Sequence, residues 1–207
     1  VLDGRAMAAA AVSALTEHGP DVPRLEAVLA QNPKLAAAEL PSGQTLLHVA
    51  AAVGAEGAVS TLLAWHGDPL AFDRARRAPL AVACAHGHVA CAEMLMDALD
   101  AKRLDILLAM ADEGGWTPLH HAACSGAAGP VRALCARGAA EALDRCREAS
   151  VTTPLHICAS NGLDTAIPEL AARLPPEALD ARDLGGRPPL VLAATEGHAR
   201  AARALLA

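Results

Sequence analysis

One sequence pattern recurs five times along this chain and limits the possible folds more than any other feature. Each copy is a short apolar stretch with a leucine near its start, and the leucines are Leu47, Leu80, Leu119, Leu155 and Leu190. Successive leucines lie 33, 39, 36 and 35 residues apart. This spacing is typical of proteins in which similar units pack mainly on their neighbours. We therefore predict a stack of small units rather than one globular core.

The residues around each leucine predict the start of a short helix. Thr is a favoured N-cap because its oxygen accepts from a free backbone amide, and Pro fits the first helical position because an N–H would have no partner there. The residues of this Thr-Pro-Leu-His signature are Thr45, His48, Thr117, Pro118, His120, Thr153, Pro154 and His156. The departures from it are Leu46, Ala78, Ala81, Pro188 and Val191. We expect weaker helix caps at the departures.

A glycine seven residues after each leucine predicts the end of this first helix. The glycines are Gly54, Gly87, Gly126, Gly162 and Gly197. Glycine readily adopts the left-handed conformation that often ends a helix, and a second stretch with helical spacing of apolar residues follows each one. Each unit is therefore predicted to be an antiparallel helix pair. Acidic residues recur in the turn seven residues before the leucine, as Asp73, Asp112, Glu148 and Asp183.

This combination of period, signature and glycine resembles the ankyrin repeat family. The resemblance implies an all-α solenoid of stacked antiparallel helix pairs joined by short β-hairpin-like loops. We expect one ankyrin repeat domain over residues 1–207. Its expected parts are a divergent N-terminal repeat at 1–40, repeats at 41–73, 74–112, 113–148 and 149–183, and a truncated last repeat at 184–207.

Three segments depart from the regular pattern. Residues 1–40 lack the signature but contain two helical stretches, and terminal repeats are usually divergent because they seal the stack. An insertion at 97–110 predicts a longer helix or an extra turn, and it is either a binding feature or a neutral change of length. The last repeat has no capping unit after it, so we expect an exposed apolar flank and further repeats beyond it.

Composition and charge argue against several classes of function. The net charge of −6 gives no general attraction to nucleic acid, and no apolar run is long enough to span a membrane. The six cysteines, Cys84, Cys91, Cys124, Cys135, Cys146 and Cys158, are dispersed without a Cys-x-x-Cys pair. Such a pattern favours reduced, mostly buried thiols in an intracellular protein, cytoplasmic or nuclear.

The sequence lacks the common motifs of enzymes and cofactor-binding proteins. Neither lysine lies in a phosphate-binding loop, and no nucleophile elbow or zincin motif occurs. Cys84, His86, His88 and Cys91 are the densest set of potential metal ligands, but the two cysteines are expected on core-facing positions of different helices. The resemblance implies that the signature histidines are structural. We expect no enzymatic activity, no cofactor and no metal.

The resemblance also implies that a partner binds along the hairpin tips and the inner helices. The candidate partner-binding residues are Trp116, Arg77, Arg74, His86, Glu113, Ser125, Thr152, Asn161, Arg187 and Glu196. Trp116 is the leading candidate because Trp is enriched among residues that dominate interfaces. It either lies exposed in the groove or folds over its own hairpin. The tip with Arg74, Arg76 and Arg77 either meets an acidic peptide or is an ordinary solvated hairpin.

The expected function is therefore a protein–protein interaction module that binds another protein through its concave groove and hairpin tips. The alternative is a regulatory or targeting domain of a larger enzyme, channel or complex subunit whose active part lies outside this sequence. Fold alone does not decide between these two functions. No nucleic acid and no membrane insertion are expected, and the sequence does not indicate an oligomeric state.

Overall fold

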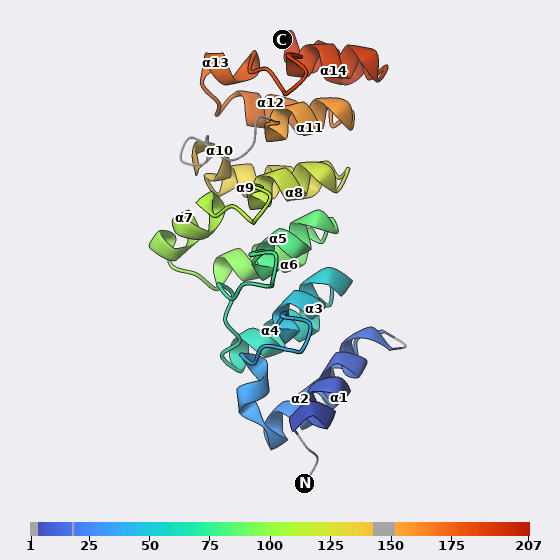
Figure 1. Ribbon diagram of the computed structural model, residues 1–207, viewed down its shortest axis with the longest axis vertical. Helices are drawn as coiled ribbons and strands as arrows, with labels where there is room; N and C mark the ends of the chain where they lie inside the picture. The colour runs from blue at the N-terminus through green and yellow to red at the C-terminus, as the bar shows by residue number, and fades with distance from the viewer. Residues whose placement is uncertain (1–3, 18, 143–151) are drawn as a thin grey trace. The chain divides into compact units, whose positions relative to one another are not determined.

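The computed structural model describes residues 4–17, 19–142 and 152–207. Within these residues the chain forms fifteen α-helices, one 3-10 helix and no β-strand (Figure 1). The predicted all-α class is confirmed. The chain divides into two compact units, residues 1–100 and 101–207, and each is described by itself.

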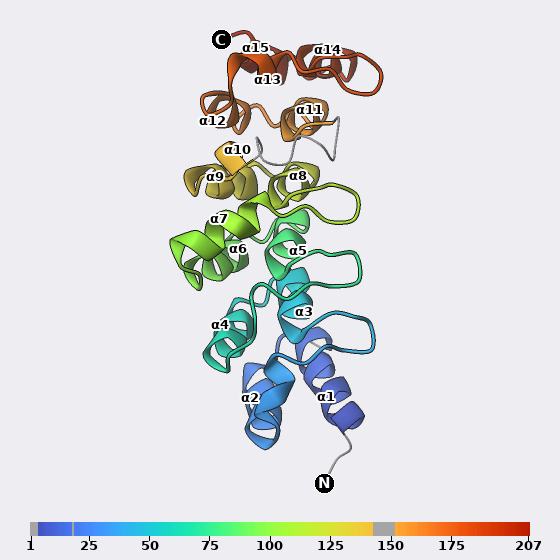
Figure 2. The same cartoon turned by 60° about the vertical axis from the view of Figure 1, so that its left-hand side comes forward.

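The first unit contains three helix pairs. The pairs are α1 (Gly4–Thr16) with α2 (Val22–Gln31), α3 (Leu46–Val53) with α4 (Glu56–Ala64), and α5 (Pro79–Ala85) with α6 (Val89–Asp97); a 3-10 helix, η1, spans Pro33–Ala36. Helices α1, α3 and α5 pack in series, and so do α2, α4 and α6 (Figure 2). The loops that precede α3 and α5 extend beyond the helices as hairpin tips. This arrangement is the predicted stack of antiparallel pairs.

The second unit repeats the same arrangement with three additional short helices. Its pairs are α8 (Pro118–Cys124) with α9 (Ala128–Ala136), α11 (Pro154–Ser160) with α12 (Ile167–Ala171), and α14 (Pro189–Thr195) with α15 (Ala199–Leu205). The additional helices are α7 (Ala101–Ala109), α10 (Ala139–Ala142) and α13 (Pro176–Leu179). Helices α8, α11 and α14 pack in series, as do α9, α12 and α15.

The predicted insertion at 97–110 contains α7, a helix separate from α6. Leu107 and Leu108 are buried, whereas Ile106 is 48% exposed. Helix α7 packs on α8 and α10. The insertion therefore adds a helix to the second unit rather than lengthening α6.

The hairpin loops are closed by two backbone hydrogen bonds each rather than by a β-strand ladder; in one of the two, the N–H of Arg76, Gly115 or Gly43 donates to the carbonyl oxygen of Asp73, Asp112 or Leu40. The N–H of Asp73 donates to the carbonyl oxygen of Arg77 (3.0 Å), and the N–H of Asp112 donates to that of Trp116 (3.0 Å). Leu40 and Gln44 pair in the same way at 2.7 Å. The tips are therefore short and place the residue before each N-cap at a fixed position beside the inner helix.

The glycine that ends an inner helix leaves room for a side chain from the next repeat. Gly54 and Gly162 have φ of 77° and 68°, in the left-handed region that favours glycine. A Cβ atom at Gly54 would lie 2.6 Å from Nδ1 of His88, and one at Gly162 would lie 2.7 Å from Nδ1 of His198. Glycine at these two positions is therefore required by packing as well as by backbone conformation.

The core of each unit is built on the shared leucines. Leu47, Leu80, Leu119 and Leu155 are fully buried, whereas Leu190 is half-buried. In the last helix pair Val191 is 40% exposed and Leu206 is 71% exposed. Burial of apolar area stabilises the fold by about 25 cal/mol per Å². The last pair therefore gains less from its own leucine than the pairs before it.

Candidate interaction surface

The signature histidine of the first unit links two consecutive hairpin loops. The backbone N–H and the hydroxyl of Thr45 donate to Nδ1 of His48 at 3.1 and 2.9 Å, and Nε2 of His48 donates to the carbonyl oxygen of Arg77 at 2.9 Å. A backbone N–H only donates and a carbonyl only accepts, so His48 is the neutral tautomer with its proton on Nε2. The start of α3 is thereby joined to the loop before α5.

The second unit contains two histidines with the same geometry. The N–H and hydroxyl of Thr117 lie 3.2 and 2.8 Å from Nδ1 of His120, and Thr153 lies at the same distances from His156. Nε2 of His156 donates to the carbonyl oxygen of Arg187 at 3.1 Å. Each histidine therefore caps its own helix.

These three histidines are neutral at pH 7. Burial lowers the pKa of His48 and of His156, although hydrogen bonds to backbone carbonyls partly oppose it. Burial and the neighbouring His121 lower the pKa of His120 to about 4. Protonation would place a hydrogen on Nδ1, where a threonine N–H already points. The signature histidines are thus structural hydrogen-bonding residues with no ring nitrogen left for catalysis.

Two hairpin loops are held by an aspartate and an arginine. Oδ1 of Asp73 accepts from the backbone N–H of Ala75 and Arg77, and Oδ2 accepts from Nε and Nη2 of Arg77 at 2.9 and 2.8 Å. Asp183 and Arg187 form the same bidentate pair at 3.0 and 2.8 Å. Burial alone would raise the pKa of Asp73, but the hydrogen bonds and charge of Arg77 outweigh it and lower this pKa. Arg77 and Arg187, both predicted to bind a partner, therefore also hold their own hairpins.

The hairpin before α8 uses a different partner for its aspartate. Trp116 stands at the position of Arg77 and Arg187 and has no charge to offer. Oδ1 of Asp112 accepts from the backbone N–H of Gly114 and Trp116, both at 2.9 Å, and Oδ2 lies 2.9 Å from Nε2 of His121. The other four repeats have Val49, Val82, Ile157 and Leu192 at the position of His121. This repeat thus differs at two positions that meet at one carboxylate.

Trp116 is half-buried against the first turn of α8. The centroid of its ring lies 6.1 Å from that of His120, with 29° between the ring planes, and 5.5 Å from that of His121, with 60° between the planes. Such offset and tilted contacts are typical of aromatic pairs. The indole therefore packs over its own hairpin and helix, and part of it remains accessible to solvent.

His86 of the first unit is exposed but hydrogen-bonded to its own helix. Its Nδ1 donates to the carbonyl oxygen of Val82 at 3.0 Å, and its ring is parallel to that of His88, with 6.2 Å between centroids. Nε2 of His88 donates to the carbonyl oxygen of Ala52 at 3.2 Å. His88 links α3 to the next pair, and only the Nε2 edge of His86 is free of a described hydrogen bond.

In the second unit, two predicted residues also form structural hydrogen bonds. Oγ of Ser125 donates to the carbonyl oxygen of Ala122 at 2.7 Å and accepts from the N–H of Ala127 at 3.2 Å. Nδ2 of Asn161 donates to the carbonyl oxygen of Ala123 at 3.0 Å. The exposed side chain of Asn161 thereby joins α11 to α8.

The ten predicted partner-binding residues divide between the two units. Those of the first unit are Arg74, Arg77 and His86, and those of the second are Glu113, Trp116, Ser125, Thr152, Asn161, Arg187 and Glu196. Glu113 and Glu196 are exposed, and Thr152 is half-buried. The candidate surface is therefore considered in each unit separately.

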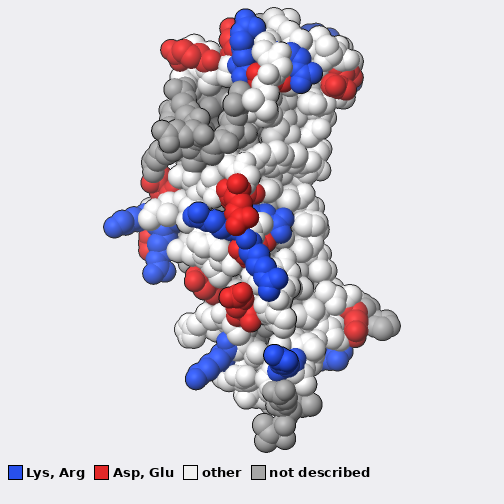
Figure 3. Space-filling model, in the orientation of Figure 1, with Lys and Arg blue, Asp and Glu red and all other residues white. Residues whose placement is uncertain are grey.

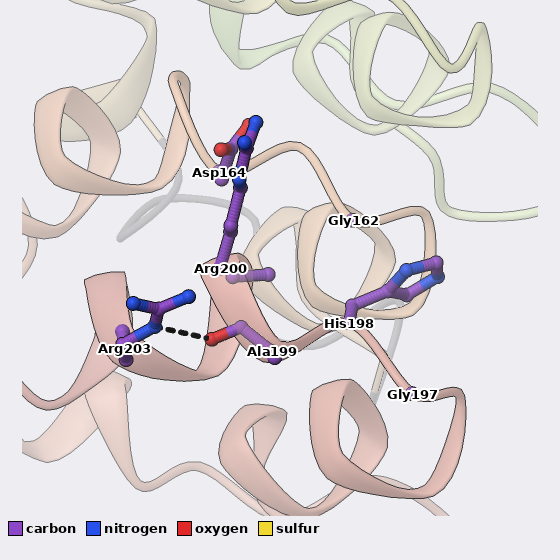
Figure 4. A pocket seen from close by; sticks show the side chains of 8 residues that line it. Gly162, Asp164, Gly197, His198, Ala199, Arg200 and Arg203 are labelled. Atoms are coloured by element: carbon purple, nitrogen blue, oxygen red, sulfur yellow. Dashed lines mark hydrogen bonds between the residues drawn. The ribbon is translucent and has the colours of Figure 1, made fainter.

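A hollow of about 470 Å³ lies where α15 begins (Figure 4). Its lining includes Asp164, His198, Arg200 and Arg203. Nε2 of His198 donates to the carbonyl oxygen of Ser160 at 2.8 Å, and Nε of Arg203 donates to that of Ala199 at 3.3 Å. Figure 4 shows the side chain of Arg200 extending to Asp164. The histidine and the Arg203 guanidinium are thus already engaged in hydrogen bonds within the protein.

Charged residues on the surface are scattered in small groups. Figure 3 shows Lys and Arg interspersed with Asp and Glu on the face in view, between broad uncharged areas. Among the described residues, no three His, Cys, Asp or Glu side chains gather in a way that suits a metal ion. Cys84 and Cys91 are buried, and burial raises the pKa of Cys84 to about 12.

The sequence of this chain matches the profile of a known protein family. The profile described as ankyrin repeats (3 copies) matches residues 9–106 and 74–143, which together span more than half of the chain. The chain belongs to the ankyrin repeat family. Ankyrin repeats are generally protein–protein interaction modules, and the family is typically non-enzymatic.

A solved structure shows the same fold. The ankyrin repeat domain from Acinetobacter baumannii AYE is similar to this chain with a TM-score of 0.71 and 23% sequence identity, covering 99% of this chain and 97% of that one. No curated protein matches the chain in sequence. In the part of the chain that the structure describes, no helix is both long enough and apolar enough to cross a membrane.

Sequence reasoning missed one residue of the candidate surface, His121. His121 was not singled out, although a histidine at a position that is aliphatic in the other repeats is a detectable signal. The bonds from His88 and Asn161 to the preceding repeat need tertiary structure to be seen. Glu148, the acidic residue predicted in the turn before Leu155, lies outside the described residues.

Proposed function

We propose that the second unit binds a partner protein through the surface around Trp116. The observation that carries this proposal is the exchange at one hairpin: Trp116 occupies a position where Arg77 and Arg187 hold an aspartate, and His121 takes over the aspartate instead. The hairpin keeps its structure without an arginine. The position is thereby released for an aromatic side chain.

The chemistry of the surrounding residues suits a protein interface. A half-buried indole offers apolar area and an N–H donor at low cost in side-chain entropy, and Trp is enriched among residues that dominate binding energies. Exposed Glu113 lies in the same hairpin, and exposed Asn161 is fixed by its bond to α8. Glu113 supplies a polar group in the hairpin of Trp116, and Asn161 supplies one at the other end of α8, where the polar rim of an interface would lie.

We also propose that the protein is intracellular, in the cytoplasm or the nucleus. All five cysteines in the described residues are free thiols, and Cys84, Cys91, Cys135 and Cys158 are buried. Disulfide-poor, buried cysteines are usual in reducing compartments. Equilibrium unfolding with and without dithiothreitol should therefore give the same midpoint, whereas a lower midpoint in the reductant would contradict this location.

The binding proposal is tested by quantitative affinity capture with Trp116→Ala. We expect a specific partner to be retained by the wild-type chain and its affinity to fall by about 2 kcal/mol or more in the variant. Trp65→Phe is the matched control, because Trp65 ends α4 in the other unit. Unfolding curves must show that both variants fold. Equal retention by wild-type and a folded Trp116→Ala chain would remove Trp116 from the interface.

A further inference from the structure

A second hairpin tip, in the first unit, carries three arginines, and the stability of the loop does not explain one of them, Arg76. We propose that this tip, formed by Arg74, Arg76 and Arg77, binds an acidic segment of a partner protein. The inference rests on the proposed function in so far as the chain is a protein-binding module. It concerns a different unit and a different chemistry from the Trp116 surface.

Arg76 has a backbone conformation that glycine adopts more easily. Its φ is 60°, and the residues at the same position in three other hairpins, Gly43, Gly115 and Gly186, have φ of 85°, 77° and 73°. The left-handed region is unfavourable for a residue with a Cβ atom. Residues held in such conformations cluster at functional sites. An arginine here therefore costs local stability relative to the glycine of the other hairpins.

Nothing in the described structure compensates that cost. No described residue forms a hydrogen bond or ion pair with the guanidinium of Arg76. The carboxylate of Asp73 is not available to it, because both oxygens of Asp73 already accept two hydrogen bonds from Ala75 and Arg77. The guanidinium of Arg76 is therefore exposed and free to meet a ligand.

The two neighbouring arginines are held in place. Nη2 of Arg74 donates to the carbonyl oxygen of Pro41 at 2.7 Å, and its side chain crosses Gly43 so closely that a Cβ there would collide with Cγ of Arg74. Arg77 is fixed by its bidentate bond to Asp73 and its side chain is 36% exposed. Side chains that are already ordered lose less entropy when they bind. Arg74 and Arg77 are therefore already ordered in the same tip as the free guanidinium of Arg76.

The charge of the tip fits an acidic ligand. Three arginines and one aspartate give residues 73–77 a net charge of +2 in a chain of net charge −6. Arg74 also lines a hollow of about 520 Å³ together with Arg5, while Glu39 lines the same hollow. Guanidinium groups donate in a fork that matches a carboxylate or a phosphate group. The negative charge of the rest of the chain is screened beyond about 8 Å at physiological salt.

An acidic peptide suits this tip better than a nucleic acid does. Binding to a phosphate backbone depends on many cationic contacts along the ligand, whereas this positive charge is confined to one loop. A short run of Glu, Asp or phosphorylated Ser needs only two or three guanidinium groups. The peptide is therefore the expected ligand, and an oligonucleotide is the alternative to be excluded.

The test measures binding of three labelled probes by fluorescence anisotropy at low and physiological salt. The probes are a peptide with four consecutive glutamates between Gly-Ser flanks, the same peptide with glutamines, and a single-stranded oligonucleotide of equal charge. We expect the glutamate peptide alone to bind the wild-type chain, more weakly at higher salt. Equal binding of the two peptides, or tighter binding of the oligonucleotide, would overturn the proposal.

Arg76→Gly separates a binding role from a structural one. Removing the guanidinium should weaken glutamate-peptide binding by about five- to tenfold, while the glycine should raise the denaturation midpoint because the backbone is no longer strained. Arg76→Gln should weaken binding without raising the midpoint. Lys34→Gln, which removes one positive charge from an exposed site in the same unit, should leave peptide binding unchanged.

The outcomes distinguish this inference from the proposed function. Unchanged peptide binding in Arg76→Gly, or a lower denaturation midpoint, would overturn the arginine tip. Trp116→Ala should bind the glutamate peptide as the wild-type chain does. Suppose that Trp116→Ala captures its protein partner normally while Arg76→Gly no longer binds the peptide. The proposal that Trp116 binds the partner would then be wrong, and the proposal that the arginine tip binds an acidic segment would be supported.

Discussion

His120 and Trp116 lie against each other at the start of α8 and serve different purposes. His120 is 4% exposed, and its Nδ1 accepts hydrogen bonds from Thr117. Its ring is therefore fixed and neutral. Trp116 is half-buried and packs on that ring. Both positions at the start of the helix can be read from the sequence, because they follow from the distance to Leu119. The sequence did not decide how Trp116 packs, since that depends on His121 and Asp112, which meet only in three dimensions.

Protonation of the buried histidines should destabilise the protein in mild acid. The pKa of His120 is about 4 in the folded chain and 6.5 in the reference state, so the unfolded chain binds the proton first as the pH falls. The contribution is fully present above pH 6.5 and is lost as the pH falls from there towards 4. Between pH 7.5 and 5 we expect His120 alone to cost about 2 kcal/mol of unfolding free energy. Urea unfolding at both pH values measures it.

The matched variant for this experiment is His120→Asn, which keeps a hydrogen-bond acceptor and cannot titrate. It should be less stable than the wild-type chain at pH 7.5 and should lose less stability on going to pH 5. An identical loss in both proteins would show that protonation of His120 does not contribute. His48 and His156 titrate in both proteins and therefore cancel in the comparison.

At the scale of the element, the inner helices differ in how their first turns are capped. Helices α8 and α11 begin with a threonine, a proline and a histidine, and the side chains complete a capping box. Helix α5 begins with Pro79 after Ala78, whose side chain forms no cap. Sequence reasoning expected this weakness because Ala has no side-chain oxygen. The helix forms nonetheless, since burial of Leu80 and its neighbours stabilises it.

Ala78→Thr should stabilise the first unit by supplying the missing N-cap. The backbone of Ala78 is already extended, with φ −82° and ψ 161°, as it is at Thr153, with φ −81° and ψ 160°. A threonine oxygen there would accept from the N–H of Ala81, and such caps contribute about 0.5–2 kcal/mol. Chemical denaturation measures the gain. Ala78→Val has the same shape without the oxygen, so an equal gain in Ala78→Val would contradict the capping explanation.

At the scale of the whole molecule, the repeat pattern predicted most of the fold. The leucine period reflects the packing of each repeat, and the signature and the glycine reflect where a helix starts and ends. Such local requirements can be recognised in a sequence. The short helices α10 and α13 and the division into units of residues 1–100 and 101–207 were not predicted. They depend on packing between residues far apart in the chain. The insertion was located, but its form as the separate helix α7 was not.

The candidate surface contains both residues that follow the repeat pattern and residues that depart from it. Positions that repeat, such as His48 and His156, turn out to hold successive loops together. Positions that break the repeat, such as Trp116 and Arg76, contribute less to that scaffold or oppose it. We therefore regard departures from the pattern as the source of binding specificity, and the pattern itself as the source of stability.

The most direct test of this claim is the affinity of Trp116→Arg for the captured partner, measured by isothermal titration calorimetry. The arginine restores the residue that pairs with aspartate in two of the other hairpins, so the unfolding free energy should stay within about 1 kcal/mol of the wild-type value. The partner's dissociation constant should rise by about thirtyfold or more. Unchanged affinity in the folded variant would contradict the claim.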